Sequence, residues 1–207
     1  MSSDPAKILK NVYWIGGATD AGKSTVAKLL AEKHGLAVYH YDSTDVEHDT
    51  HLAASDLEHL GFVNAHLDKR WVDMEPPELL QLTLASFRAR WSMVVQDIRG
   101  FREERLLAEG FGLLPELLAE VADAKRCIFM VPTPEFKSMS VQNRDKPTWR
   151  HQTRDPDRSR RNLLGRDELL AAYVRNSASR LGMPVISVHI DTPPDEMAKV
   201  VEKLFGL

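Results

Sequence analysis

The chain contains the stretch Gly17-Ala18-Thr19-Asp20-Ala21-Gly22-Lys23-Ser24, which fits the pattern G-x-x-x-x-G-K-[ST]. In this pattern the glycines let the backbone curl, so that successive N–H groups point inward at phosphate oxygens. The helix that follows adds the positive end of its dipole to the same site. Lys23 supplies a cation for the β- and γ-phosphates, and the Ser24 hydroxyl can bind Mg²⁺. The stretch therefore predicts a site for ATP and Mg²⁺.

The sequence on either side of this stretch supports the prediction. Residues 11–15 are rich in β-branched and aromatic side chains, which favours a strand that runs into the glycines. Residues 23–34 have the apolar spacing of a helix, and Gly35 lies where a helix C-cap belongs. The residues expected to bind the nucleotide are Gly17, Thr19, Asp20, Ala21, Gly22, Lys23, Ser24 and Thr25.

Further strands and helices alternate along the rest of the chain. We expect strands over 36–41, 105–108, 127–131 and 184–190, and helices over 78–98, 115–122, 167–181 and 194–205. Strands that alternate with helices form a parallel sheet covered on both faces, so the predicted class is a three-layer α/β/α fold. Ligands on such sheets bind at the carboxyl ends of the strands, where the loop of residues 17–24 lies.

Composition limits the class of protein. The chain has 207 residues, of which 43% are hydrophobic and 28% charged, which suits one domain over 1–207 with a packed core. A single cysteine, Cys127, excludes an internal disulfide and a zinc site built on cysteines, and its place within a strand predicts a buried, inert thiol. Apolar runs fall far short of the roughly 20 residues of a membrane span, and residues 1–5 do not resemble a secretory signal. We therefore expect a cytoplasmic protein that does not bind membranes.

One segment is strongly basic, although the formal net charge of the chain is −3. Residues 137–166 carry nine Lys and Arg against three Asp, a net charge of +6 on a body of −9. A positive segment on an acidic body is what a phosphate-closing lid requires, because arginines stabilise charge on a transferred phosphoryl group. The alternative is an exposed basic loop whose ion pairs contribute little.

Other classes of nucleotide-binding protein fit less well. A GTPase needs N-K-x-D, whereas Asn143-Arg144-Asp145-Lys146 has these letters in another order. Asp97-Ile98-Arg99-Gly100 matches a D-x-x-G switch pattern but lies at the end of a predicted helix. An L-S-G-G-Q transporter signature does not occur.

The chain resembles instead the small-molecule and nucleoside-monophosphate kinases of the P-loop class. Besides residues 17–24, the stretch LLAEGFG over 106–112 is similar to the strand and D-G-F-P-R segment of adenylate kinases, with Glu109 as the acid and without the P-R pair. Arg166-Asp167-Glu168 is similar to the R-x-D-D that ends their lid. The stretches EGFGLLPELL and FMVPTPEF also resemble 2-phosphoglycerate-kinase-like and antibiotic-phosphotransferase-like proteins. The resemblance implies a P-loop NTPase fold with a five-stranded parallel sheet and an arginine-rich lid over about 137–166.

The resemblance also implies roles for residues at the predicted strand ends. Asp42 would take or orient the acceptor hydroxyl proton, with a helix N-cap as the alternative. Glu109 would hold Mg²⁺ together with Ser24, with a solvated strand-end carboxylate as the alternative. The expected catalytic residues are Lys23, Asp42, Arg166, Arg158 and Arg161. The expected acceptor-binding residues are Asp42, Asp45, Arg144 and Arg150, next to a flap over about 43–77.

We therefore expect an ATP-dependent kinase that phosphorylates a hydroxyl or phosphate of a small metabolite, with an anionic acceptor as one option. The alternative is a regulatory or nucleic-acid-engaging P-loop protein with slow ATPase activity. Trp149 and His151 within the basic segment give slight support to nucleic-acid binding, which the net negative charge disfavours. Trp71 and Trp91 are expected to pack in the core or flap. Histidines of the flap are expected to face solvent or substrate, with a metal site as the alternative, and they are His48, His51, His59 and His66.

Overall fold

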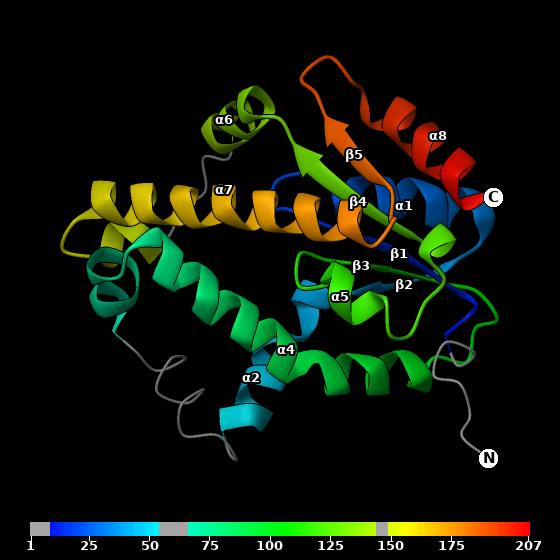
Figure 1. Cartoon of the computed structure of the whole chain (residues 1–207), viewed down its shortest axis with the longest axis horizontal. Coiled ribbons are helices and arrows are strands. Elements are labelled where there is room, and N and C mark those ends of the chain that lie inside the picture. The colour runs from blue at the N-terminus through cyan, green and yellow to red at the C-terminus, as the bar shows by residue number, and fades with distance from the viewer. Residues whose placement is uncertain (1–8, 54–65, 144–148) are drawn as a thin grey trace.

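The computed structural model describes residues 9–53, 66–143 and 149–207, and within them one sheet of five parallel strands lies at the centre (Figure 1). The strands run in the order β2-β3-β1-β4-β5. Their bounds are β1 Val12–Gly17, β2 Ala37–His40, β3 Leu106–Glu109, β4 Cys127–Pro132 and β5 Val185–Val188. The longer helices are α1 Lys23–His34, α2 Asp45–Ala53, α4 Pro76–Gly100, α6 Pro134–Asn143, α7 Pro156–Arg180 and α8 Pro194–Phe205. The shorter helical segments are η2 Tyr41–Thr44, η3 Lys69–Asp73, α5 Pro115–Leu118, η4 Ala124–Arg126 and η5 Trp149–Gln152.

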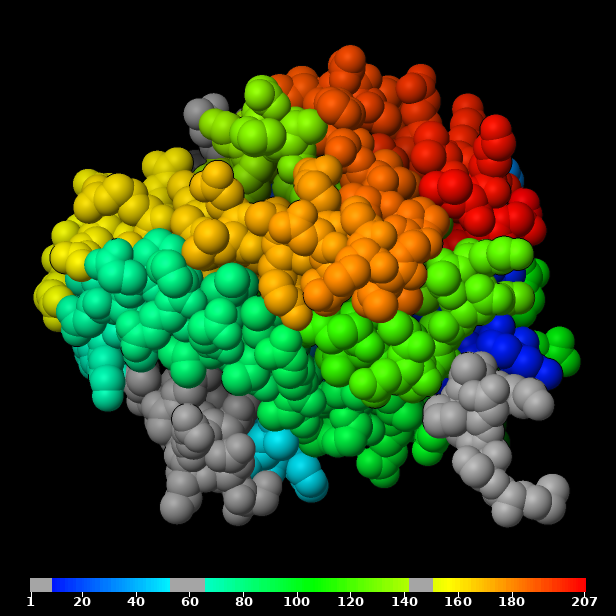
Figure 2. Space-filling model, in the orientation of Figure 1, coloured from blue at the N-terminus to red at the C-terminus, as the bar shows by residue number. Residues whose placement is uncertain are grey.

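Helices cover both faces of the sheet because its central strands are apolar on both sides. Every residue of β1, β3 and β4 is buried, which is typical of parallel strands. One core cluster joins the sheet to α1 and α8, and the other joins it to α4, α5 and α7. Figure 2 shows the second of these faces, where α7 forms a continuous band between α4 and α6. The predicted three-layer α/β/α class is confirmed.

The carboxyl end of β1 carries the loop of residues 17–24 into the middle of the sheet. β1 pairs with β3 on one side and with β4 on the other, and Gly17 lies opposite Met130 of β4. A Cβ on Gly17 would lie 2.0 Å from the Met130 carbonyl oxygen, and its φ of 130° disfavours other residues. The predicted helix over 23–34 is confirmed, and it ends at Gly35 in a left-handed conformation (φ 62°).

The prediction for the segment before residue 167 was wrong. We expected a polar stretch with a helix from 167, but α7 begins at Pro156 and runs for 25 residues. The Asp155 side chain accepts a hydrogen bond from the Arg158 backbone N–H at 2.9 Å and caps this helix. Its buried stripe starts with the polar Ser159 and Asn162, so apolar spacing did not reveal it. The predicted lid segment therefore contains α6, η5 and the first turns of α7.

Smaller predictions were mostly confirmed. The helix predicted over 194–205 is α8, and the Cys127 thiol is buried in β4 with its pKa raised by that burial to about 12. Trp71 is buried, and the half-buried Trp91 packs 6.2 Å from Trp14 between ring centroids. The helix predicted over 115–122 ends earlier, at Leu118. No helix within the described ranges is long and apolar enough to cross a membrane.

Replacing Gly17 should damage the fold more than replacing a glycine in open space. We expect Gly17→Ala to lower the free energy of unfolding by about 3 kcal/mol or more, because backbone strain and a clash with Met130 add together. Gly182→Ala, with a φ of 67° and no heavy atom within 4 Å of a Cβ, should cost about 1 kcal/mol. Urea unfolding of both variants measures the difference. Equal losses would contradict this account of the β1–β4 contact.

Candidate functional site

The loop after β1 forms a concave backbone that suits phosphate. Gly17, Asp20 and Gly22 all have positive φ values, of 130°, 61° and 74°. Left-handed residues among right-handed ones turn successive N–H groups to one side, which makes an anion-binding nest. The Ala18 N–H is bound to the Met130 carbonyl at 3.0 Å, so β4 anchors the start of the nest.

Lys23 is buried at the first turn of α1, where it retains only 8% exposure. Its Nζ donates a hydrogen bond of 2.7 Å to the Ala18 carbonyl oxygen. Burial lowers the pKa of this ammonium, and the carboxylates of Asp42, Glu109 and Asp20 oppose the shift. The Lys23 ammonium is therefore surrounded by acidic side chains from three parts of the chain.

Oxygen ligands for a divalent cation lie next to Lys23. The Ser24 hydroxyl donates to Glu109 Oε2 at 3.1 Å, and His40 Nδ1 lies 2.8 Å from Glu109 Oε1. Glu109 ends β3 and is 4% exposed, so it differs from the solvated carboxylate that was the alternative. A hydroxyl and a carboxylate are hard oxygen donors of the kind that Mg²⁺ takes in nucleotide sites. Ser24 and Glu109 therefore fit the predicted metal site.

Asp42 faces the same space from the first turn after β2. A cavity of about 190 Å³ is lined by residues 19–25 together with Asp42, Glu109 and Phe111. Asp42 is exposed, yet partial desolvation beside the cavity raises the pKa of its carboxyl to about 6; Lys23 opposes this shift, and Asp45 and Glu109 reinforce it. The cavity brings together the loop of residues 17–24 (the phosphate loop), the predicted metal ligands Ser24 and Glu109, and a carboxyl group that can exchange a proton near pH 6.

Asp45 does not line this cavity. Its carboxylate forms an ion pair with Arg90 of α4, which is 2% exposed. The Arg90 guanidinium also lies over the Tyr41 ring, 4.2 Å from the ring centroid. Sequence reasoning missed Arg90, although a charged residue beside Phe87 and Trp91 on a predicted apolar helix face was a usable signal.

The predicted arginines are placed very differently. Arg166 is buried, donates to Thr83 Oγ1 at 3.1 Å and stacks on Trp71, with 5.6 Å from its Cζ to the ring centroid. Arg158 is exposed and pairs with Glu75, and Arg161 is also exposed. None of the three, Arg166 included, lines the cavity. Arg144 and the side chain of Arg150 lie outside the part of the chain that the structure describes.

Phe111 at the cavity belongs to an aromatic cluster that reaches α4. The rings of Tyr41, Phe87 and Phe111 meet edge to face, with centroid separations of 4.9 to 6.2 Å. Phe111 also lines the cavity, so this cluster is an apolar wall on the side of the site facing α4. Such walls suit the carbon skeleton of a small molecule.

The described histidines of the predicted flap do not form one cluster. His48 is buried, with Nε2 3.0 Å from Asp97 Oδ2, whereas His51 and His66 are exposed. His59 lies outside the described residues. Within the described ranges, no three His, Cys, Asp or Glu side chains lie close enough together to hold a metal ion.

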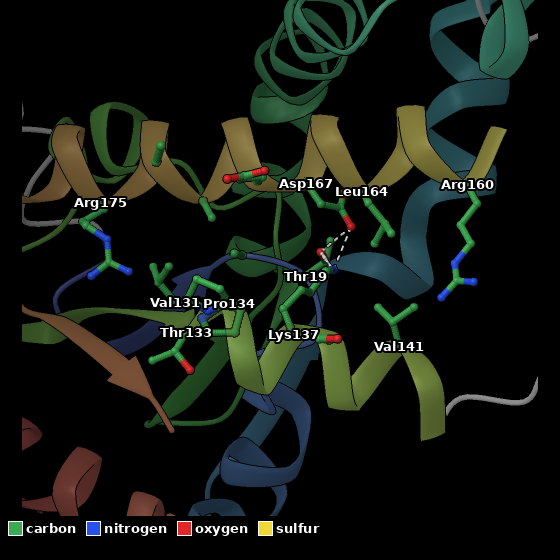
Figure 3. A pocket seen from close by; sticks show the side chains of 16 residues that line it. Thr19, Val131, Thr133, Pro134, Lys137, Val141, Arg160, Leu164, Asp167 and Arg175 are labelled. Carbon is green, nitrogen blue, oxygen red and sulfur yellow. Dashed lines mark hydrogen bonds and ion pairs between the residues drawn. The ribbon is translucent and has the colours of Figure 1, made fainter. Parts of the chain in front are cut away.

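A second cavity, of about 400 Å³, lies between α6 and α7 (Figure 3). Its walls are mostly apolar and include Val131, Pro134, Val141 and Leu164. At its centre Lys137 of α6 contacts both Thr19 of the phosphate loop and Asp167 of α7 (Figure 3). The sequence indicated Lys137 only as part of the basic segment and did not predict these contacts.

Comparisons with known proteins identify solved structures of similar fold. No family model and no curated protein sequence matches the chain. Among solved structures, deoxyadenosine kinase from M. mycoides has a TM-score of 0.52 at 11% identity, covering 95% of this chain and 100% of that one. The protein TT1252 from Thermus thermophilus has a TM-score of 0.52 at 16% identity, covering 96% and 98% of the two chains. An uncharacterized protein from Eubacterium ventriosum has a TM-score of 0.51 at 14% identity, covering 95% and 99%. The chain therefore has a fold like that of P-loop kinases.

The raised pKa of Asp42 has a consequence for stability. A carboxyl whose pKa is higher in the folded state stabilises the fold while protonated, and this contribution is lost as the pH rises through about 6. Because Asp42 is exposed and solvent screens its charge, we expect Asp42→Asn to unfold at only a slightly higher temperature than the unmodified chain at pH 8, with a smaller difference at pH 4.5. Thermal unfolding followed by circular dichroism measures this, with Asp191→Asn at an exposed turn as the control. A difference that shrinks toward pH 8 would contradict the assignment.

Proposed function

We propose that the chain is an ATP-dependent kinase that transfers the γ-phosphoryl group to a hydroxyl or phosphate oxygen of a small metabolite. The observation that carries the proposal is the 190 Å³ cavity, onto which Lys23, Ser24, Glu109 and Asp42 converge. Phosphoryl transfer needs positioned cations and a positioned base more than covalent chemistry. The fold shared with deoxyadenosine kinase agrees with this reaction class without identifying the acceptor. We place the activity in the cytoplasm, where ATP is available.

Each residue of the cavity then has one task. The loop N–H groups and Lys23 bind the phosphates of ATP. Ser24 and Glu109 would hold Mg²⁺, which neutralises charge on the β- and γ-phosphate oxygens when bound. Asp42 accepts the proton of the acceptor hydroxyl as the new O–P bond forms and the bond from the γ-phosphorus to ADP breaks. Where a phosphate oxygen is the acceptor, Asp42 orients that group instead.

The acceptor would lie beside Asp42 and the aromatic wall at Phe111, with Arg166 of α7 behind the lining of the cavity. Arg166 is next to Asp167, which accepts a hydrogen bond of 2.7 Å from Thr19 at the edge of the cavity. The Arg166 Nε is buried without a hydrogen-bond partner among the described residues. Arg166 already pairs with Asp167, and its remaining hydrogen-bonding capacity favours a further anion, so we propose an acceptor that carries a carboxylate or phosphate. Arg166 would also stabilise the transferred phosphoryl group.

The activity can be tested without knowing the acceptor. ADP release from Mg-ATP is measured across sugars, sugar phosphates, hydroxy acids, nucleosides, nucleotides and aminoglycosides. We expect one acceptor class to stimulate release and Lys23→Ala to lower it by about 10²-fold or more, because a cation on the phosphates is lost. Lys28→Ala, an exposed lysine of the same helix, should retain activity. ATP turnover unaffected by every acceptor would favour the regulatory or nucleic-acid-engaging alternative, and oligonucleotides would then be tested.

The role of Arg166 can be separated from that of the exposed arginines of α7. With the acceptor identified in the panel, Arg166→Met should raise its KM by about 10- to 100-fold, because a charge-assisted hydrogen bond is lost. Arg166→Lys should lose less, and Arg161→Met should match the unmodified enzyme. Steady-state kinetics and a folding check by circular dichroism provide the data. An unchanged KM in folded Arg166→Met would remove this arginine from the acceptor site.

A further inference from the structure

The strongest unexplained feature outside the cavity is the ammonium group of Lys137. Its Nζ donates to Thr19 Oγ1 at 2.7 Å, to Asp20 Oδ2 at 2.6 Å and to Asp167 Oδ2 at 2.8 Å. An ammonium group has three N–H donors, so all three are used. The side chain is 18% exposed, and those of its two acidic partners are 10% and 6% exposed. This is a partly buried cluster that joins the phosphate loop to α6 and α7 (Figure 3).

The Lys137 cluster offsets a negative charge within the phosphate loop. Asp20 lies inside the nest that would bind the phosphates of a nucleotide, and its φ of 61° is unfavourable for a residue other than glycine. A carboxylate at this position repels polyphosphate, because like charges interact strongly in a partly buried site. The ammonium of Lys137 lies 2.6 Å from the Asp20 carboxylate and cancels its charge. It also lies within electrostatic reach of Lys23.

Thr19 and Asp167 complete the cluster from the other side. The Thr19 hydroxyl donates to Asp167 Oδ2 at 2.7 Å and accepts from Lys137. Arg166 forms an ion pair of 2.8 Å with the other oxygen of the Asp167 carboxylate. The second acid is therefore shared between two cations, and Lys137 joins it to Asp20 in the contacts of the described residues. Lys137 of α6 thus contributes to offsetting the charge of Asp20.

We propose that Lys137 is a positioning residue for nucleotide binding, which neutralises Asp20 and holds the first half of the phosphate loop so that the loop accepts a polyphosphate. The inference rests on the nucleotide-binding part of the proposed function and not on the identity of the acceptor. Lys137 is assigned to the loop and not to the reacting atoms, because its three donors are all used within the protein. Its effect should therefore appear in nucleotide affinity and should grow with the charge of the nucleotide.

Calorimetric titration of Mg-ATP, Mg-ADP and AMP into the full chain tests the proposal. We expect Lys137→Met to weaken ATP binding by about 10- to 100-fold, ADP binding by less and AMP binding least, because the charge of Asp20 is then less fully offset and repels the more highly charged nucleotide more strongly. Lys137→Arg, which keeps the charge, should stay within about threefold of the unmodified chain. Lys199→Met, an exposed lysine of α8, controls for the loss of one positive charge.

The decisive comparison is the double variant Lys137→Met/Asp20→Asn. Removing both charges should restore most of the ATP affinity lost in Lys137→Met, whereas a merely structural role of Lys137 predicts no rescue. Equal affinity of Lys137→Met and the unmodified chain, or a loss that Asp20→Asn does not relieve, overturns the proposal. Circular dichroism shows that each variant is folded, and Lys137→Arg decides the question if Lys137→Met does not fold, since tight ATP binding by it supports the charge role and weak binding opposes it.

The outcomes also separate this inference from the proposed kinase activity. If the unmodified chain binds ATP but phosphorylates none of the acceptors, the kinase proposal fails while the affinity series still decides the role of Lys137. If the unmodified chain binds neither ATP nor ADP in the presence of Mg²⁺, both proposals fail together.

Discussion

The site depends on the close approach of the glycine end of β1 to β4. A Cβ on Gly16 would lie 2.5 Å from the Phe129 ring, and one on Gly17 would lie 2.0 Å from the Met130 carbonyl oxygen. Only glycines fit at these two positions, because any Cβ would clash with β4. Because β1 is flanked by β3 and β4, its loop emerges beside Glu109 on one side and beside α6 on the other. The positions of the predicted metal ligands and of the Lys137 cluster both follow from this placement of the loop.

The site also concentrates charge that the fold alone would not favour. Lys23, Glu109, Arg90 and Arg166 are all at least nine-tenths buried. Buried charges are costly unless they are paired, and here most pairs join different elements: Ser24 with Glu109, and Arg90 with Asp45. Such partly compensated groups are typical of sites that bind charged ligands, and the raised pKa of Asp42 is another sign of the same arrangement.

The reaction class and the acceptor rest on different evidence. The likeness to deoxyadenosine kinase, at 11% identity, shows the fold alone and does not identify an acceptor. The proposed acceptor side is formed by an edge-to-face cluster at Phe111 and by Arg166, which stacks on Trp71. An apolar wall with a buried cation beyond it favours a small carbon skeleton that bears an anionic group.

Sequence alone was sufficient for the phosphate loop, for α1 and α8, and for the α/β class, because these depend on local spacing and on glycines at fixed positions. It also located Asp42 and Glu109, since the ends of neighbouring parallel strands meet: His40 of β2 pairs in register with Glu109 of β3. Tertiary structure alone decided the start of α7, whose buried stripe is polar, and the roles of Arg90 and Lys137. Lys137 contacts a threonine 118 residues away in the sequence, and no local pattern encodes a contact between residues that only the packed helices bring together.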